Sequence, residues 1–146
     1  MNSSNSIDLS FFVPCYNEAD NIADSLDVIR SVMKDQKMTY EILVVDDGST
    51  DGTIEIINAY RDTHRDLAIV IHRNTTNLGL GRNYLRWAKE ARGVYYMLIN
   101  GDNSILASDL KAILAERGKA DMIIPYVVNQ NDRSLHRNLL SRLFVA

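Results

Sequence analysis

Four carboxylates in this sequence stand just after apolar runs, at positions where strands would end. Glu18 follows the first run, Asp46 and Asp47 follow the second, and Asp102 follows the fourth. The carboxyl ends of parallel strands lie at one edge of a sheet, and α/β proteins bind ligands in the crevice beyond that edge. We therefore expect these acids to lie close together in one site.

Close carboxylates need compensation, because like charges repel and raise one another's pKa. A divalent cation or several hydrogen-bond donors would supply it. Mg²⁺ and Mn²⁺ prefer oxygen ligands, and Mg²⁺ is commonly held by one or two carboxylates together with substrate phosphates. The residue types therefore indicate a phosphorylated ligand such as a nucleotide, with Mg²⁺ or Mn²⁺ as cofactor.

The same residues also admit plainer interpretations. Asp, Gly, Ser and Asn make ordinary turns, so residues 46–53 and residues 100–103 could be simple connections. Cys15 has no His or acid arranged around it in the sequence as a nucleophile would, so we expect a structural cysteine. His64, His72 and His136 are scattered and show no metal-ligand spacing.

The elements that must position these residues alternate along the chain. Apolar runs predict strands over residues 8–14, 41–47, 67–72, 94–99 and 122–128. Apolar residues at helical spacing predict helices between them, over residues 21–33, 54–60, 84–91 and 109–118. This alternation indicates right-handed βαβ crossovers. We therefore predict an α/β fold with a doubly wound, mostly parallel sheet and helices on both faces.

Local signals predict how some of these elements begin and end. Ser49 or Asp51 can cap the second helix, and Gly93 stands where a glycine commonly ends a helix. The loop after the first strand, residues 14–18, contains no glycine that would let the backbone approach a pyrophosphate. The fingerprint of a dinucleotide-binding domain is therefore missing.

Composition limits the class of protein. A chain of 146 residues, 46% hydrophobic and 24% charged, suits a single soluble domain, with residues 1–6 as a loose lead-in. The formal net charge of −3 argues against nucleic acid as a partner. The single cysteine permits no intrachain disulfide, and no apolar run reaches membrane-spanning length. We expect a cytoplasmic protein.

The last part of the chain differs in character. Residues 129–146 form a polar linker followed by the start of an amphipathic helix in which leucines alternate with arginines. One interpretation is peripheral contact of residues 133–146 with the cytoplasmic face of a membrane. The other is a helix whose packing partner lies in a part of the domain beyond this sequence.

Five short motifs occur in order along the chain. They are VPCYNE (residues 13–18), VVDDGSTDGT (44–53), NLGLG (77–81), NGD (100–102) and RNLLSR (137–142). In order and spacing they resemble the family 2 glycosyltransferases, which have the GT-A nucleotide-sugar-binding fold, and within them the branch related to dolichol-phosphate mannose synthase. The family's catalytic domain is longer than this chain. The resemblance therefore implies a GT-A domain that is incomplete at its carboxyl end.

The resemblance implies a nucleotide-binding role for residues after the first two strands. Pro14, Tyr16 and Glu18 match positions that line the nucleotide pocket. Val45 and Asp47 match the pair that meets the base and the ribose.

The resemblance also implies a metal site. Asn100, Gly101 and Asp102 fall on the family's Asp-x-Asp motif, whose carboxylates hold the metal against the diphosphate of the donor. Asn100 replaces the first Asp of that motif. We therefore expect Asp102 to be the principal metal ligand and the catalytic residue acting through the metal, with lower metal affinity.

The implied activity is an inverting glycosyl transfer from a GDP- or UDP-sugar to an acceptor. Relatives that glycosylate a sugar hydroxyl use a base from the part of the domain beyond this sequence, so we assign no general base. A lipid phosphate needs none, because it is largely ionised near neutral pH. We therefore favour a polyprenyl phosphate over a sugar as acceptor.

Two alternatives remain. The chain could be a donor-binding module that acts within a longer chain or with a partner. A nucleotidyltransferase is less favoured, since no glycine- and lysine-rich activation loop follows the first strand.

Overall fold

The computed structural model describes residues 6–125, in which strands and helices alternate. The chain divides into two compact units, residues 1–112 and 113–146, and the sheet lies in the first. The elements are β1 (Ile7–Cys15), α1 (Ile22–Met33), β2 (Tyr40–Asp46), α2 (Thr53–Thr63), β3 (Ile69–Arg73), α3 (Leu80–Glu90), β4 (Gly93–Leu98) and α4 (Ala107–Ala115).

The described strands form one parallel sheet in the order β3-β2-β1-β4. The chain moves outward from β1 to β3 and then returns to place β4 on the other side of β1. The strand order therefore reverses between β1 and β4, which makes the carboxyl end of this pair the switch point of the sheet. The register sets Cys15 beside Asp46, and Asp46 beside Arg73.

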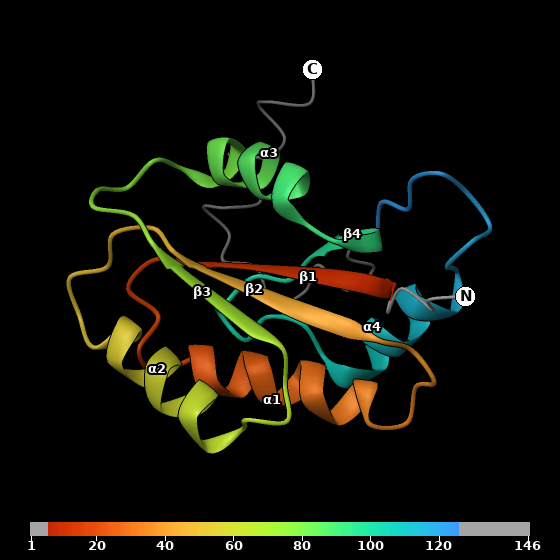
Figure 1. Ribbon diagram of the computed structural model, residues 1–146, viewed down its shortest axis with the longest axis horizontal. Helices are drawn as coiled ribbons and strands as arrows, with labels where there is room; N and C mark the ends of the chain where they lie inside the picture. The colour runs from red at the N-terminus through yellow and green to blue at the C-terminus, as the bar shows by residue number, and fades with distance from the viewer. Residues whose placement is uncertain (1–5, 126–146) are drawn as a thin grey trace, which may run out of the picture. The chain divides into compact units, whose positions relative to one another are not determined.

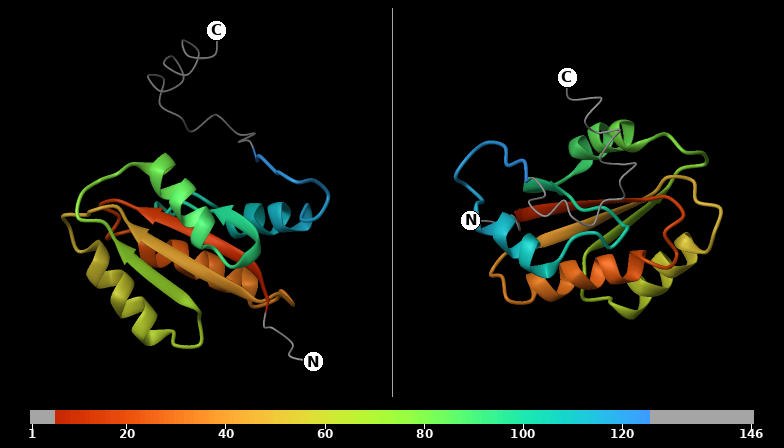
Figure 2. Two further views of the ribbon diagram at one scale, coloured as in Figure 1. Left: turned by 45° about the horizontal axis from the view of Figure 1, so that its top comes forward. Right: turned by 180° about the vertical axis from the view of Figure 1, so that it is seen from behind.

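Helices cover both faces of the sheet. α1 and α2 lie on one face and α3 lies on the other, as all three views show (Figure 1, Figure 2). The prediction of a doubly wound parallel sheet is confirmed for the described residues. The buried strand residues explain the arrangement, since side chains alternate between the two faces of a strand and both faces are apolar here.

Phe12, Leu43 and Val45 pack with Trp87 of α3 in one core cluster. Their neighbours Phe11, Ile42 and Val44, also fully buried, belong by alternation to the opposite face, which α1 and α2 cover.

Two predicted helix ends are wrong. α2 begins at Thr53, and its N-cap is Gly52 rather than Ser49 or Asp51. Ser49 accepts a hydrogen bond from the loop after β1, whereas Asp51 accepts one from that loop and one from Thr53 N (3.0 Å). α3 ends at Glu90, and Gly93 opens β4. A Cβ on Gly93 would lie 2.4 Å from Ser10 N, so a glycine is needed there for close strand packing.

The described part of the predicted fifth strand is also different. Residues 122–125 form no strand, and Met122 and Ile124 are about three-quarters exposed, at 75% and 77%. An apolar run becomes a strand only when a neighbouring strand pairs with it. Residues 126–128, the lead-in residues 1–5 and the basic segment 129–146 lie outside the described residues.

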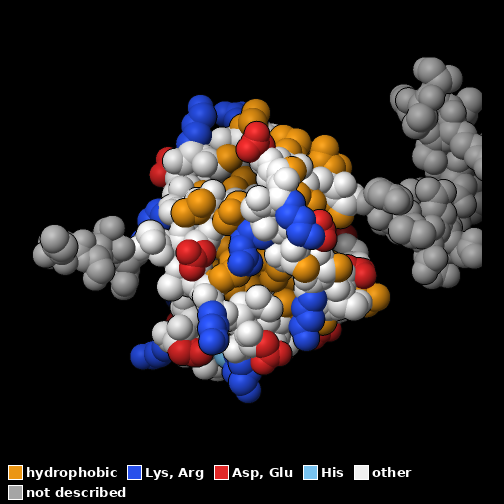
Figure 3. Space-filling view, turned by 90° about the vertical axis from the view of Figure 1, so that its right-hand side faces the viewer, with side chains coloured by type: hydrophobic (Ala, Val, Ile, Leu, Met, Phe, Trp, Pro, Cys, Tyr) orange, Lys and Arg blue, Asp and Glu red, His pale blue; other side chains and the backbone are white. Residues whose placement is uncertain are grey.

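The strands begin at the edge that Figure 3 faces, where charged side chains of both signs lie among hydrophobic ones. Near this edge the Glu41 side chain is 1% exposed. It accepts hydrogen bonds from Ser10 Oγ (2.7 Å), Arg92 N (2.9 Å) and Arg92 Nε (2.8 Å). Burial raises the pKa of Glu41, but these hydrogen bonds outweigh burial and hold that pKa below its ordinary value. Glu41 thus ties the first two strands to the residues that open β4.

None of the helices within residues 6–125 has the length and apolar character needed to cross a bilayer.

Candidate functional site

An open pocket of about 260 Å³ lies beyond the carboxyl ends of the strands. Its wall comes from the loop after β1, the end of β2, the loop that opens α3 and the loop after β4. The lining residues are Pro14, Cys15, Tyr16, Glu18, Asp47, Asn77, Gly79, Leu80, Asn83, Asn100, Gly101 and Asp102. The pocket therefore occupies the switch point where α/β proteins bind ligands.

The pocket contains all but one of the residues that the sequence assigned to the nucleotide and the metal. Pro14, Tyr16 and Glu18 meet Asp47 and the 100–102 segment there, although up to 88 positions separate them in the chain (102 − 14). Val45 lies apart from them. It is completely buried in the core cluster with Trp87 and forms no part of the pocket wall.

Asp47 is held by the loop that opens α3. Its Oδ1 accepts hydrogen bonds from Asn74 Nδ2 (2.7 Å) and Leu78 N (2.9 Å), and its Oδ2 accepts one from Gly79 N (2.9 Å). Burial raises the pKa of Asp47, but the hydrogen bonds, first of all that from Leu78 N, outweigh it and bring the pKa below its ordinary value. Asp47 is therefore ionised at neutral pH and shapes the pocket through this loop.

Gly48 explains how that loop comes so near. Its φ of +81° lies in the left-handed region, which favours glycine. A Cβ at this position would lie 2.8 Å from the backbone carbon of Thr76. The glycine of the Asp-Asp-Gly-Ser segment therefore allows the 74–79 loop to pack against the end of β2.

Asp102 lies on the exposed side of the pocket. Its Oδ1 accepts a hydrogen bond from Ser104 N at 3.1 Å, as a turn-forming Asp does, and its Oδ2 has no hydrogen-bond partner within residues 6–125. The preceding Gly101 is buried, and a Cβ there would lie 2.9 Å from Cys15 Cβ. The segment is thus both a turn and part of the pocket, with Gly101 letting it approach β1.

A divalent metal fits this pocket only in part through protein ligands. Residues 6–125 contain no group of three or more His, Cys, Asp or Glu side chains arranged to hold a metal ion. Asp102 and Asn100 nevertheless bring oxygen atoms to the wall, and both residues are exposed. Mg²⁺-type sites are commonly completed by substrate phosphates and water. This donor set therefore suits a metal shared with a diphosphate rather than an all-protein site.

The expected cluster of four carboxylates around one cation is wrong for Asp46. That side chain is fully buried, lies outside the pocket wall, and pairs with Arg73 at 3.3 Å between Oδ2 and Nε. Glu18 accepts a hydrogen bond from Asn21 Nδ2 at 2.8 Å. The negative charges of Asp46, Asp47 and Glu18 are therefore each stabilised by a different set of hydrogen-bonding or charged partners.

Sequence reasoning missed the residues that open α3. Asn77, Leu80 and Asn83 line the pocket. Asn83 is 1% exposed, accepts from Asn74 Nδ2 at 2.9 Å and donates to Gly79 O at 3.2 Å. The available signal was Asn83 itself. It lies four residues before Trp87 and thus on the same helix face, shortly after the glycine-containing 77–81 loop.

Cys15 lies in the pocket wall but is a buried thiol. Burial raises its pKa above the ordinary value, and the nearby Asp46 carboxylate adds to the effect. The thiol therefore stays protonated, as expected for a structural cysteine rather than a nucleophile.

Comparison with known proteins shows that this chain is similar to glycosyltransferases. The profile described as Glycosyl transferase family 2 matches residues 10–144. Abequosyltransferase RfbV of Salmonella typhimurium is 36% identical over 106 residues, covering 73% of this chain and 31% of the relative. A dolichyl-phosphate beta-glucosyltransferase of Dictyostelium discoideum is 29% identical over 117 residues, covering 77% of this chain and 36% of the relative.

A solved structure shows the same fold. Mannosyltransferase PcManGT from Pyrobaculum calidifontis, in complex with GDP-Man and Mn²⁺, superposes with a TM-score of 0.60 at 28% identity. The match covers 74% of this chain and 32% of that one. The chain thus spans about a third of the length of these relatives.

Proposed function

The chain belongs to glycosyl transferase family 2, and we propose that its pocket binds a nucleotide-sugar donor, a GDP- or UDP-sugar, for inverting transfer of the sugar to an acceptor. The observation that carries the proposal is the convergence of Tyr16, Glu18, Asp47 and Asp102 in one pocket at the switch point.

In this proposal each part of the wall has a task. Tyr16, 46% exposed, offers an aromatic surface to the base, and ionised Asp47 with its 74–79 loop forms the neighbouring wall. Asp102 and Asn100 would hold Mg²⁺ or Mn²⁺ together with the donor diphosphate. When bound, the metal would neutralise charge on the departing nucleoside diphosphate. The Mn²⁺ in the PcManGT complex supports this choice of cofactor.

We propose a polyprenyl phosphate as the acceptor. The name of the Dictyostelium relative, a dolichyl-phosphate glucosyltransferase, supports this acceptor class. A phosphate monoester is largely ionised near neutral pH and needs no general base. Such an acceptor is carried by a membrane, so contact of residues 133–146 with its cytoplasmic face belongs to the same proposal.

A second function is a donor-binding module that acts within a longer chain or with a partner. The described residues contain the proposed donor pocket, and in this function another segment or a partner supplies the acceptor site. Donor binding without transfer to any phosphate or sugar acceptor would favour this module.

Isothermal calorimetry tests the proposed function. Folded protein is titrated with GDP, UDP, GDP-mannose and UDP-glucose, each with and without Mn²⁺. We expect one base to be preferred and the binding to depend on Mn²⁺. The absence of heat with all four ligands in the presence of Mn²⁺ would sink the proposal.

A further inference from the structure

The pocket wall that carries Tyr16 and Glu18 is held by the loop after β2. Three successive backbone N–H groups of the wall donate to three different side chains, two from that loop and one from the first residue of α2. Asn17 N donates to Ser49 Oγ (2.9 Å), Glu18 N to Thr53 Oγ1 (2.9 Å) and Ala19 N to Asp51 Oδ2 (3.2 Å). Each of these N–H groups would otherwise need water or another partner.

The wall adopts a conformation that requires such support. Asn17 has a φ of +57°, in the left-handed region that few non-glycine residues other than Asn and Asp enter. The Asn17 side chain also contacts the loop after β2, because Thr50 N donates to Asn17 Oδ1 at 2.8 Å. Strained backbone of this kind persists where the surroundings determine it strongly.

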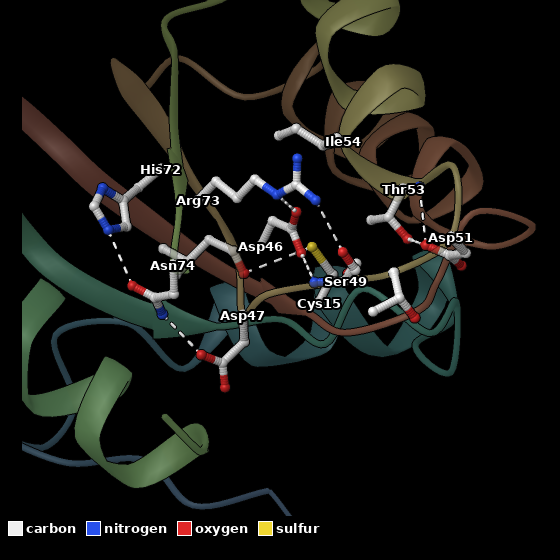
Figure 4. Close-up of polar contacts among 12 residues, drawn as sticks. Cys15, Asp46, Asp47, Ser49, Asp51, Thr53, Ile54, His72, Arg73 and Asn74 are labelled. Carbon is white, nitrogen blue, oxygen red and sulfur yellow. Dashed lines mark hydrogen bonds and ion pairs between the residues drawn. The ribbon is translucent and has the colours of Figure 1, made fainter. Parts of the chain in front are cut away.

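The supporting loop is itself held by β2 and β3 (Figure 4). Ser49 N donates to Asp46 Oδ1 at 2.9 Å, and Arg73 Nη2 donates to Ser49 O at 2.9 Å. The same guanidinium pairs with Asp46 Oδ2. Asp46 is fully buried and Arg73 is half exposed, so Arg73 reaches inward from the end of β3 to balance a buried charge.

Thr53 forms the other support. Its side chain is completely buried, and its hydroxyl accepts from Glu18 N while it donates to Asp51 Oδ1. Asp51 Oδ1 also accepts from Thr53 N at 3.0 Å. The hydroxyl therefore links the backbone of the wall to the first turn of α2.

We propose that Asp46, Ser49, Thr53 and Arg73 are positioning residues for the donor pocket. All four lie outside the pocket wall, yet through the 16–19 backbone they determine where Tyr16 and Glu18 stand. Their link to the donor rests on the proposed function, whereas their hold on the 16–19 segment does not depend on any ligand.

Thr53 offers the sharpest test. Thr53→Val keeps the shape of the side chain and removes the hydroxyl, whereas Thr53→Ser keeps the hydroxyl and removes only a methyl group. Thr63→Val is the control for the same chemical change at an exposed position, since Thr63 lies at the far end of the same helix and its hydroxyl bonds only within that region. Three properties are compared: amide hydrogen exchange, affinity for nucleoside diphosphate with Mn²⁺, and the free energy of unfolding.

In Thr53→Val we expect the amides of residues 17–19 to exchange about tenfold faster while the β1 core amides change little. Affinity for the nucleoside diphosphate should fall about tenfold, the scale of losing a preorganised contact. Thr53→Ser and Thr63→Val should stay within about twofold of the unchanged protein on both measures.

A purely structural role predicts another result. A general loss of stability in Thr53→Val would speed exchange across β1 as well as at residues 17–19. That outcome overturns the proposal, as does unchanged exchange at residues 17–19 in Thr53→Val or a loss of affinity in Thr53→Ser as large as that in Thr53→Val. If the unchanged protein binds no nucleotide, the proposed function is wrong. In that case the hydrogen-exchange rates of residues 17–19 still test whether Thr53 holds this segment.

Arg73 provides a second variant, at a half-exposed position on a different strand. Arg73→Gln removes the charge that faces Asp46, and Arg61→Gln removes a surface ion pair on α2 as its matched control. We expect Arg73→Gln to loosen residues 17–19 and weaken nucleotide binding, and Arg61→Gln to do neither. Equal behaviour of the two variants would contradict the proposal.

Discussion

At the scale of residues, carboxylates that look alike in the sequence have separate tasks. Asp46 pairs with Arg73 beneath the pocket, and Asp47 holds the loop that opens α3. Asp102 instead lies exposed on the wall with one oxygen bonded to Ser104 N. Among these three acids it is the one best placed to bind an ion together with a ligand.

This placement makes Asp102→Asn the direct test of metal dependence. The change leaves two neutral amides at positions 100 and 102, so the donor diphosphate is no longer bridged to the protein. We expect Mn²⁺-dependent binding of nucleoside diphosphate to weaken about tenfold or more, which corresponds to about 1.4 kcal/mol. Calorimetry at fixed Mn²⁺ measures it.

Asn100→Asp is the reciprocal variant. It restores a second carboxylate and should tighten Mn²⁺ binding. The folded state should survive both changes, because both side chains are exposed on a loop. Unchanged Mn²⁺ and nucleotide affinity in Asp102→Asn would show that residues 100–103 are only a turn.

At the scale of elements, Glu41 joins the beginnings of β1, β2 and β4. Gly93 N donates to Ser10 Oγ at 2.8 Å, and that hydroxyl donates to Glu41. Arg92 adds backbone and side-chain hydrogen bonds to the same carboxylate. β4 does not pair with β2, because β1 lies between them. The buried Glu41 therefore connects two strands that are not neighbours in the sheet.

The depressed pKa of Glu41 gives a pH dependence with a definite sign. A lowered folded-state pKa means that the unfolded chain binds the proton more readily, so the contribution to stability is present above the unfolded value, about 4.3. It is lost as pH falls through the folded value. Glu41→Gln should cost about 2 kcal/mol at pH 7, the scale of hydrogen bonds to a charged group.

Urea unfolding from pH 7 down to pH 3 measures this effect. The difference in free energy of unfolding between the unchanged protein and Glu41→Gln should shrink as pH falls below about 4.3. Other carboxylates titrate in both proteins, so the difference isolates Glu41. A difference that stays constant to pH 3 would rule out ionised Glu41 as the stabilising form.

At the scale of the whole molecule, ligand binding should stabilise the unit that contains the sheet. The single tryptophan, Trp87, is 9% exposed in the core cluster beneath α3, so its fluorescence reports unfolding of that unit. A ligand that binds only the folded state at about 100 times its Kd adds about 2.7 kcal/mol to the free energy of unfolding.

We therefore expect the preferred nucleoside diphosphate with Mn²⁺ to raise the unfolding midpoint measured by Trp87 fluorescence. Mn²⁺ alone should raise it much less, because the protein provides few ligands of its own. An equal rise with Mn²⁺ alone would contradict the view that the diphosphate completes the metal site.

The sequence by itself determined the fold class, the family and most of the pocket. Hydrophobic periodicity specifies strands and helices locally, and parallel βαβ crossovers place the ends of all the strands at one edge. For that reason Tyr16, Glu18, Asp47 and Asp102 could be grouped before their distances were known. The helix end at Gly93 and the described part of the strand predicted over 122–128 are wrong, because close strand packing and strand pairing depend on neighbours distant in the chain.

Only the tertiary structure decided how the polar residues are paired. Asp46 and Asp47 are adjacent in sequence, but successive side chains of an extended strand point to opposite sides. One meets Arg73 from β3 and the other meets the loop before α3. Val45 likewise joins the core because α3 covers its face of the sheet. Hydrogen-bond partners are set by packing across the fold, and a linear sequence does not record which loop comes to lie beside which strand.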